Sequence, residues 1–172
     1  MNNVYHFEFA SPALETITML RQTWLAFNRL AEIKLAKAGL TPETLMVLWT
    51  CKDYPQPLIP AEIARITHRE NQTIAGLLNR MEKDGLVQRI PKRKGKPFTE
   101  VKITPKGEQL CDAGQPIMKA LVSDVGAGLS VEQHEQFHGL AQVLRDKSLE
   151  KLYLEPVSSP VNPPGTAACV RW

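Results

Sequence analysis

The stretch PAEIARITHRENQTIAGLLNRMEKDGLVQRI, residues 60–90, determines the fold that this sequence predicts. Proline opens a short helix at residues 60–67, and HREN then forms a turn. A second helix follows from about residue 71 to residue 84, because apolar residues recur at helical spacing along one side of it. These residues are Ile74, Leu77, Leu78 and Met81. Gly85 then caps the helix, since glycine adopts a positive φ at little cost, and the whole stretch predicts a helix-turn-helix.

The residues after Gly85 predict a β-hairpin. LVQRI (86–90) and FTEVKI (98–103) are short, partly alternating segments that suit strands. The loop PKRKGKP (91–97) joins them and contains the glycine and prolines expected of a turn. A hairpin directly behind a helix-turn-helix makes the predicted unit a winged helix-turn-helix, and the loop is the tip of its wing.

Longer helices are predicted on both sides of this unit. Ser11 and Pro12 open a helical pattern that ends at Gly39, and Thr41 with Pro42 starts the next helix, which YPQPLIP interrupts. Thr104 with Pro105 begins a helix that runs to about residue 127, and Ser130 caps a last helix that runs to about residue 154. Residues 155–172 contain four prolines without helical periodicity and predict an irregular tail. The expected fold class is therefore mainly α with a small β-hairpin wing.

Composition places the chain among globular proteins. It has 172 residues, of which 43% are hydrophobic and 23% charged. The three cysteines are widely spaced, which argues against a disulfide framework and fits a reducing compartment. The first residues show no signal peptide, and no apolar run approaches the ~20 residues that span a bilayer. We therefore expect a soluble cytoplasmic protein that contacts no membrane.

Positive charge is concentrated in the middle of the chain. Residues 60–105 hold ten Lys or Arg and five Asp or Glu, a balance of +5, whereas the whole chain carries +3. The remainder is therefore at −2. A basic middle between mildly acidic ends suggests one surface that binds a polyanion. The alternative interpretation is an ordinary charged face in contact with water.

The second helix of the helix-turn-helix offers groups that read DNA. At 100° per residue, Gln72, Gly76, Asn79 and Lys83 lie opposite its apolar side, and Thr73 and Arg80 flank them. Amides, a hydroxyl and cations are the groups that contact base edges and phosphates in a major groove. The wing loop adds cations on long, flexible stems, although a wing can also serve only for packing. The candidate DNA-binding residues are Arg69, Asn71, Gln72, Thr73, Gly76, Asn79, Arg80, Lys92, Arg93, Lys94 and Lys96.

Over residues 12–153 the chain resembles MarR-type regulators. The matching stretches are AGLTPETLMVLW, PAEIARITHRENQTIAGLLNRMEKDGLVQR, VKITPKGEQL and LSVEQHEQFHGLAQVL. The wing departs from the family pattern, because it reads KRKGKPF where an Asp-Arg-Arg-like tip is usual. Arg93 is then the nearest candidate for the minor-groove arginine. The turn HRENQT lacks the common serine-rich cap, so Glu70 or Asn71 is expected to cap the recognition helix instead.

This resemblance implies a homodimer that binds double-stranded DNA at a pseudo-palindromic operator and controls transcription, most often as a repressor. It implies dimerisation helices at residues 1–40 and 105–154, a DNA-binding lobe at 41–104, and a proline-rich tail at 155–172. A small aromatic effector often binds such proteins, and Trp24, Phe27 and Trp49 are its candidate pocket. The more common role of such aromatics, and the one favoured here, is in the core. A winged helix that docks another protein is the main alternative function.

The last predicted helix contains HEQFH, residues 134–138, which has the spacing of a zinc-peptidase motif. Such an enzyme needs a third metal ligand and a substrate cleft, and no third-ligand motif follows. Phe137, Leu140 and Leu144 instead form an apolar seam on this helix. We therefore expect no catalytic site, metal or cofactor. Cys51 could sense oxidants, but an inert buried thiol is the favoured interpretation.

Overall fold

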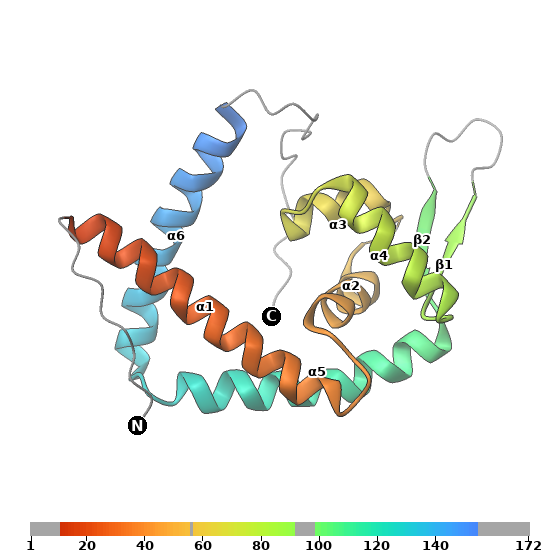
Figure 1. The fold of residues 1–172 in the computed structure, drawn as a ribbon, viewed down its shortest axis with the longest axis horizontal. Helices are drawn as coiled ribbons and strands as arrows, with labels where there is room; N and C mark the ends of the chain where they lie inside the picture. The colour runs from red at the N-terminus through yellow and green to blue at the C-terminus, as the bar shows by residue number, and fades with distance from the viewer. Residues whose placement is uncertain (1–10, 56, 92–98, 155–172) are drawn as a thin grey trace.

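The computed structural model describes residues 11–55, 57–91 and 99–154, which form six helices and one two-stranded sheet (Figure 1). This architecture confirms the predicted fold class, mainly α with a β-hairpin wing. The elements in chain order are α1 (Pro12–Ala36), α2 (Pro42–Asp53), α3 (Pro60–Thr67), α4 (Asn71–Lys83), β1 (Val87–Ile90), β2 (Glu100–Ile103), α5 (Pro105–Gly126) and α6 (Val131–Leu154).

Most helices begin at the signals that the sequence predicts. The Thr41 and Thr104 hydroxyls accept hydrogen bonds from the amides of Thr44 and Gly107, each at 3.1 Å. At the start of α6, the Ser130 backbone amide donates a hydrogen bond to the Gln133 side chain, and the Gln133 backbone amide donates one to the Ser130 hydroxyl. The start of α4 differs from the prediction. Glu70 occupies the cap position, but its side chain makes no capping hydrogen bond, and neither does that of Asn71, which is already the first helical residue.

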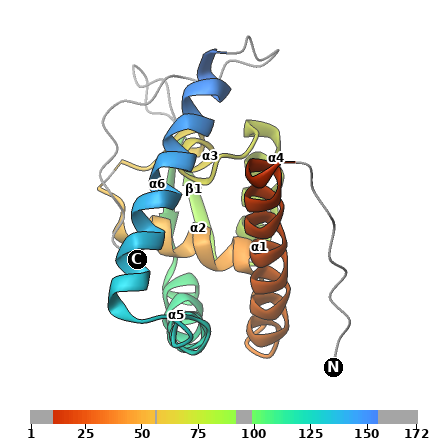
Figure 2. The same ribbon diagram turned by 90° about the vertical axis from the view of Figure 1, so that its left-hand side faces the viewer.

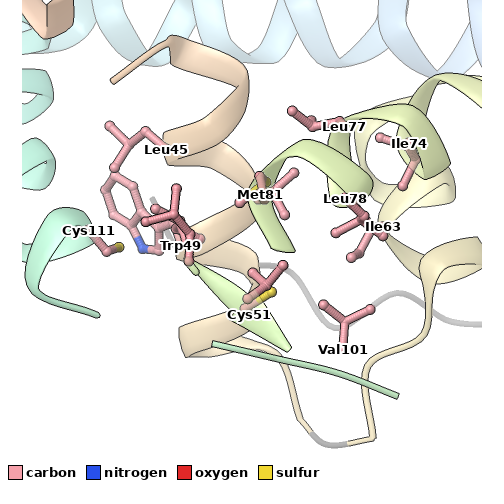
Figure 3. Packing of buried hydrophobic residues seen from close by; sticks show 14 of the residues in the cluster. Leu45, Trp49, Cys51, Ile63, Ile74, Leu77, Leu78, Met81, Val101 and Cys111 are labelled. Atoms are coloured by element: carbon pink, nitrogen blue, oxygen red, sulfur yellow. The ribbon is translucent and has the colours of Figure 1, made fainter. Parts of the chain in front are cut away.

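Helix α2 lies at the centre of the hydrophobic core. Leu45, Leu48 and Trp49 of α2 are buried together with apolar residues from α3, α4, β2 and α5. Figure 3 shows Leu45 and Trp49 among these neighbours. Helix α5 approaches this core so closely that two of its glycines leave no room for a side chain. A Cβ at Gly107 would lie 2.1 Å from the Leu86 carbonyl oxygen. The predicted helices therefore pack around α2, with backbone contact at the base of the wing.

The wing is a regular antiparallel pair with an additional neighbour. Val87 pairs with Ile103 and Ile90 with Glu100. The Val101 amide donates to the Leu58 carbonyl oxygen at 2.9 Å, so the segment before α3 runs alongside β2. This contact was not predicted, because a single extended residue carries no periodic signal. Gly85 has a φ of 71°, as its predicted role as a cap requires, and His68 takes a left-handed φ of 50° at the end of α3.

Helices α1 and α6 leave most of their apolar residues uncovered in the single chain. Only Ala31 and Leu35 of α1 are buried, and α6 has no buried residue among those whose side chains are described. Figure 2 shows α1 and α6 as separate columns on either side of α2. The exposed large hydrophobic residues of α1, of α6 and of the end of α5 with its junction to α6 are Leu14, Ile17, Met19, Trp24, Leu25, Ile33, Val122, Val125, Leu129, Val131, Phe137, Leu140, Val143 and Leu152. In the part of the chain that the structure describes, no helix has the length and apolarity needed to cross a membrane.

Candidate nucleic-acid interface

Helix α4 has one buried side and one exposed side. Ile74, Leu77, Leu78 and Met81 are buried in the core. The remaining sequence-predicted residues of this helix share the exposed side, namely Asn71, Gln72, Thr73, Gly76, Asn79 and Arg80. A Cβ at Gly76 would meet nothing within 4 Å, so no contact within the described chain requires glycine there. The structure thus brings the α4 candidates together on a single exposed surface.

The cations of this lobe fall into two groups. Arg65 and Arg89 bind carboxylates, at 2.8 Å from Glu62 and 2.6 Å from Glu82 respectively. Arg69, Arg80 and Lys83 are exposed and form no ion pair with any other residue that the structure describes. These three side chains are the ones available to an external anion, since no neighbouring carboxylate neutralises them.

The short helix α3 is held by a polar network. Arg65 donates two hydrogen bonds to Glu62 Oε2, and the Tyr54 hydroxyl donates a third to the same oxygen at 3.2 Å. The hydrogen bond with Glu62 raises the pKa of Arg65 above its usual value. Because Tyr54 follows α2, this network fixes α3 against α2 and so fixes the position from which α4 starts.

A second network joins α4 to the wing. Arg89 donates its backbone amide to Glu82 Oε1 at 3.0 Å, and its guanidinium donates two bonds to Glu82 Oε2. These bonds lower the pKa of the Glu82 carboxyl group. The pair was not predicted from the sequence, because residues seven apart that span a helix end and a strand share no periodicity. The wing-tip candidates Lys92, Arg93, Lys94 and Lys96 lie outside the described residues.

Comparison with known proteins agrees with this geometry. Residues 38–96, from the α1–α2 turn through the recognition helix and into the wing, match the family model described as the MarR family. This part of the chain is similar to the MarR family. A search of curated protein sequences gives no significant match.

Several solved structures share the fold at low sequence identity. The Staphylococcus aureus MepR–DNA complex has a TM-score of 0.70 and 21% identity, covering 82% of this chain and 99% of that chain. A mutant of Escherichia coli MarR complexed with operator DNA has a TM-score of 0.67 and 20% identity, covering 77% of this chain and 93% of that chain. CouR from Rhodococcus jostii RHA1, bound to p-coumaroyl-CoA, has a TM-score of 0.69 and 17% identity, covering 79% of this chain and 95% of that chain. The fold shared with these structures extends well beyond residues 38–96.

The aromatic residues predicted as an effector pocket occupy two different environments. Trp24 and Phe27 stack on α1 with ring centroids 6.3 Å apart, and Trp24 is 61% exposed. Trp49 lies in the core, where its indole N–H donates to Asp53 at 2.6 Å.

A cleft of about 550 Å³ opens between α2 and α4, and none of the three aromatics lines it. Its apolar wall includes Met46, Leu77 and Met81. Arg69, Thr73 and Arg80 also line it. The cleft therefore shares three side chains with the candidate DNA-binding residues.

The two histidines of HEQFH are exposed on α6. The His134 ring nitrogen Nε2 lies 2.9 Å from the Gly126 carbonyl oxygen, so this side chain bridges α6 to the end of α5. Within the described ranges, no cluster of three His, Cys, Asp or Glu residues is placed to hold a metal ion. The structure thus gives His134 a local hydrogen-bonding role.

The side chains of Cys51 and Cys111 are buried thiols. Burial, with a smaller contribution from Cys111, raises the pKa of Cys51 to about 12. Burial also raises the pKa of Cys111. Because the thiolate is the reactive form, burial disfavours reaction of both side chains near neutral pH.

Proposed function

We propose that this protein is a MarR-family transcriptional regulator that binds a specific sequence in double-stranded DNA through α4. The observation that carries the proposal is the exposed side of α4, where the amides of Asn71, Gln72 and Asn79 lie beside the cation Arg80, which no described carboxylate pairs. Asparagine and glutamine side chains can pair with adenine in the major groove, and arginine with guanine or phosphate. The open space around Gly76 suits close approach of the helix backbone to the groove.

The protein acts as a homodimer in this proposal. A helix that is apolar on several sides is stable only when its surroundings cover it. In α1, Leu14, Ile17, Met19 and Ile33 point in different directions around the helix, and each is about half exposed in the single chain. A second copy covering α1, α5 and α6 removes this apolar surface from water. Residues 1–40 and 105–154 then form the dimerisation part, and 41–104 the DNA-binding lobe.

Dimer symmetry determines how DNA is bound. Two copies related by a twofold axis present two α4 helices to successive major grooves, so the operator is a pseudo-palindrome. The similar MepR and E. coli MarR structures are complexes with DNA, which supports this arrangement. A dimer seated over a promoter blocks transcription sterically, and we therefore assign a repressor acting in the cytoplasm.

A small aromatic effector completes the proposal. Ligand-bound structures of similar fold, with p-coumaroyl-CoA in CouR and with 2,4-dichlorophenol in an organohalide-sensing regulator, support this class of ligand. We assign the effector first to the cleft between α2 and α4, because a ligand there would contact Arg69, Thr73 and Arg80 and compete with DNA for them. A site at Trp24, Phe27 and Trp49 stays a second prediction, and its α1 part needs the partner subunit to close it.

Selection from a random pool of duplex DNA tests the main proposal. The protein should enrich an inverted repeat, and a footprint on that duplex should show two protected half-sites about one helical turn apart. Binding of all duplexes with equal affinity, or of none, would overturn sequence-specific regulation. Failure to bind any duplex would favour the alternative, a winged helix that docks another protein.

A further inference from the structure

The Glu82–Arg89 pair connects the recognition helix to the first strand of the wing. Glu82 lies in the last turn of α4, and Arg89 is the third residue of β1, which contacts α4 directly (Figure 1). The two residues form three hydrogen bonds, at 3.0 Å from the Arg89 backbone amide and at 2.9 and 2.6 Å from its guanidinium. Both the backbone and the side chain of one strand residue are therefore held by a single carboxylate.

Apolar packing joins Val87, at the start of β1, to the core that also contains Leu78 and Met81 of α4, and further hydrogen bonds hold the turn between the two elements. The Leu86 amide donates to the Met81 carbonyl oxygen at 2.8 Å, and the Thr104 hydroxyl donates to the Gly85 carbonyl oxygen at 2.6 Å. Both contacts fix the chain before β1 begins at Val87. The Glu82–Arg89 pair acts two residues further along the strand, where the angle of β1 to α4 is set.

Neither stability nor long-range charge explains an acidic residue at this place. The Arg89 and Glu82 side chains are 32% and 36% exposed, and ion pairs this open to water contribute little to folding. The segment 60–105 carries +5 and is expected to meet DNA phosphates, so a carboxylate there weakens attraction. A positional role does account for it, because three bonds to one strand residue restrain both direction and twist.

We propose that Glu82 is a positioning residue that, through Arg89, holds the wing at the angle to α4 at which both contact DNA together. The inference rests on the proposed DNA-binding function. It makes a prediction opposite in sign to that of electrostatics alone: removal of this negative charge should weaken binding to DNA.

Two matched substitutions separate these effects. Glu82→Gln and Glu100→Gln each remove one negative charge from the same lobe with little change in shape. Glu100 pairs with Lys102 at 3.4 Å inside β2, so its ion pair joins no two elements. On the duplex selected by the wild type, Glu100→Gln should bind as tightly as the wild type or more tightly. Glu82→Gln should bind roughly tenfold more weakly, with a shallower dependence on salt because the wing then touches fewer phosphates.

Further readouts distinguish positioning from folding. Both variants should keep the wild-type thermal unfolding temperature within a few degrees, since the ion pairs are exposed. Glu82→Gln combined with Arg89→Gln should bind no more weakly than Arg89→Gln alone, because either substitution already breaks the same coupling. If Glu82→Gln binds as Glu100→Gln does, or loses binding only by unfolding, the positioning role is wrong.

Hydrogen exchange tests the pair without DNA. The Arg89 amide should exchange faster in Glu82→Gln than in the wild type or in Glu100→Gln, because its acceptor is weakened. A wild type that selects no DNA would overturn the proposed function, whereas an unchanged Arg89 exchange rate would overturn this inference.

Discussion

At the scale of single residues, the exposed amides of α4 have the most direct consequence for recognition. Gln72 and Asn79 are exposed and contribute nothing to the core. Gln72→Ala or Asn79→Ala should therefore cost about 1–3 kcal/mol of binding free energy on the selected duplex and little on unselected DNA. Gln109→Ala removes an exposed amide from α5 and serves as the control in the same titrations. If Gln72→Ala or Asn79→Ala lost the same binding free energy on selected and unselected DNA, these amides would contact phosphates and not bases.

The burial of the Cys51 thiol leads to predictions about its reactivity and its titration. Since burial raises its pKa to about 12, Cys51 should resist alkylation at neutral pH in the native protein and react in denaturant. The folded pKa lies above the ordinary value of 9.0, so its contribution to stability is complete below pH 9 and is lost as pH rises toward 12. Mass spectrometry of labelled peptides measures the first effect. If peroxide lowered DNA binding by the wild type but not by Cys51→Ser, the predicted low reactivity of Cys51 would be wrong.

At the scale of elements, the contact between α5 and the base of the wing depends on one glycine. A Cβ at Gly107 would lie 2.1 Å from the backbone oxygen of Leu86 and 2.9 Å from Ile103, so α5 must shift to accept it. Gly107→Ala should therefore lower the free energy of unfolding by about 1–3 kcal/mol.

Gly76→Ala provides the matched control for Gly107→Ala. Its Cβ enters open space within a helix, so the free energy of unfolding should rise by up to about 1 kcal/mol. Denaturant titration measures both variants. Equal stability changes for the two would mean that α5 moves freely against the wing.

The wing-tip loop concentrates positive charge, although its residues lie outside the described part of the chain. Lys92, Arg93, Lys94 and Lys96 place four charges within five residues, an arrangement that a polyanionic partner compensates. Replacing Lys92, Arg93 and Lys94 by alanine should flatten the slope of log affinity against log salt by about 0.9 for each phosphate that the wing no longer neutralises. The control replaces three exposed cations outside the DNA-binding lobe, namely Lys34, Lys37 and Lys151. A slope unchanged from the wild type would mean that the wing does not touch DNA.

At the scale of the whole molecule, the exposed faces of α1 and α6 are the basis of the proposed dimer. Phe137 and Leu140 are 51% and 68% exposed on α6 in a single chain. Phe137→Glu with Leu140→Glu should convert a dimer into a monomer of 19.3 kDa, because charge cannot be buried in the apolar contact. Gln142→Glu, on the opposite side of the same helix, should leave the dimer intact. Light scattering distinguishes these cases, and a monomeric wild type at micromolar concentration would contradict the dimer.

The sequence by itself determined what depends on neighbours along the chain. Helix boundaries, the hairpin and the division of α4 into a buried and an exposed side follow from periodicity and caps, as with Thr41 and Ser130, because these are local properties of the backbone. The expected side-chain cap at Glu70 is absent, which shows that even a local signal depends on which partners lie within reach.

Only the tertiary structure decided which distant groups meet. Trp24 and Trp49 are the same residue type on apolar helices, yet one is 61% exposed and the other 7%, because only α2 lies at the centre of the packing. The Glu82–Arg89 pair, the contact of Leu58 with β2 and the cleft between α2 and α4 likewise arise from elements brought together in space. Such contacts depend on three-dimensional proximity, which the spacing of residues in a single sequence does not encode.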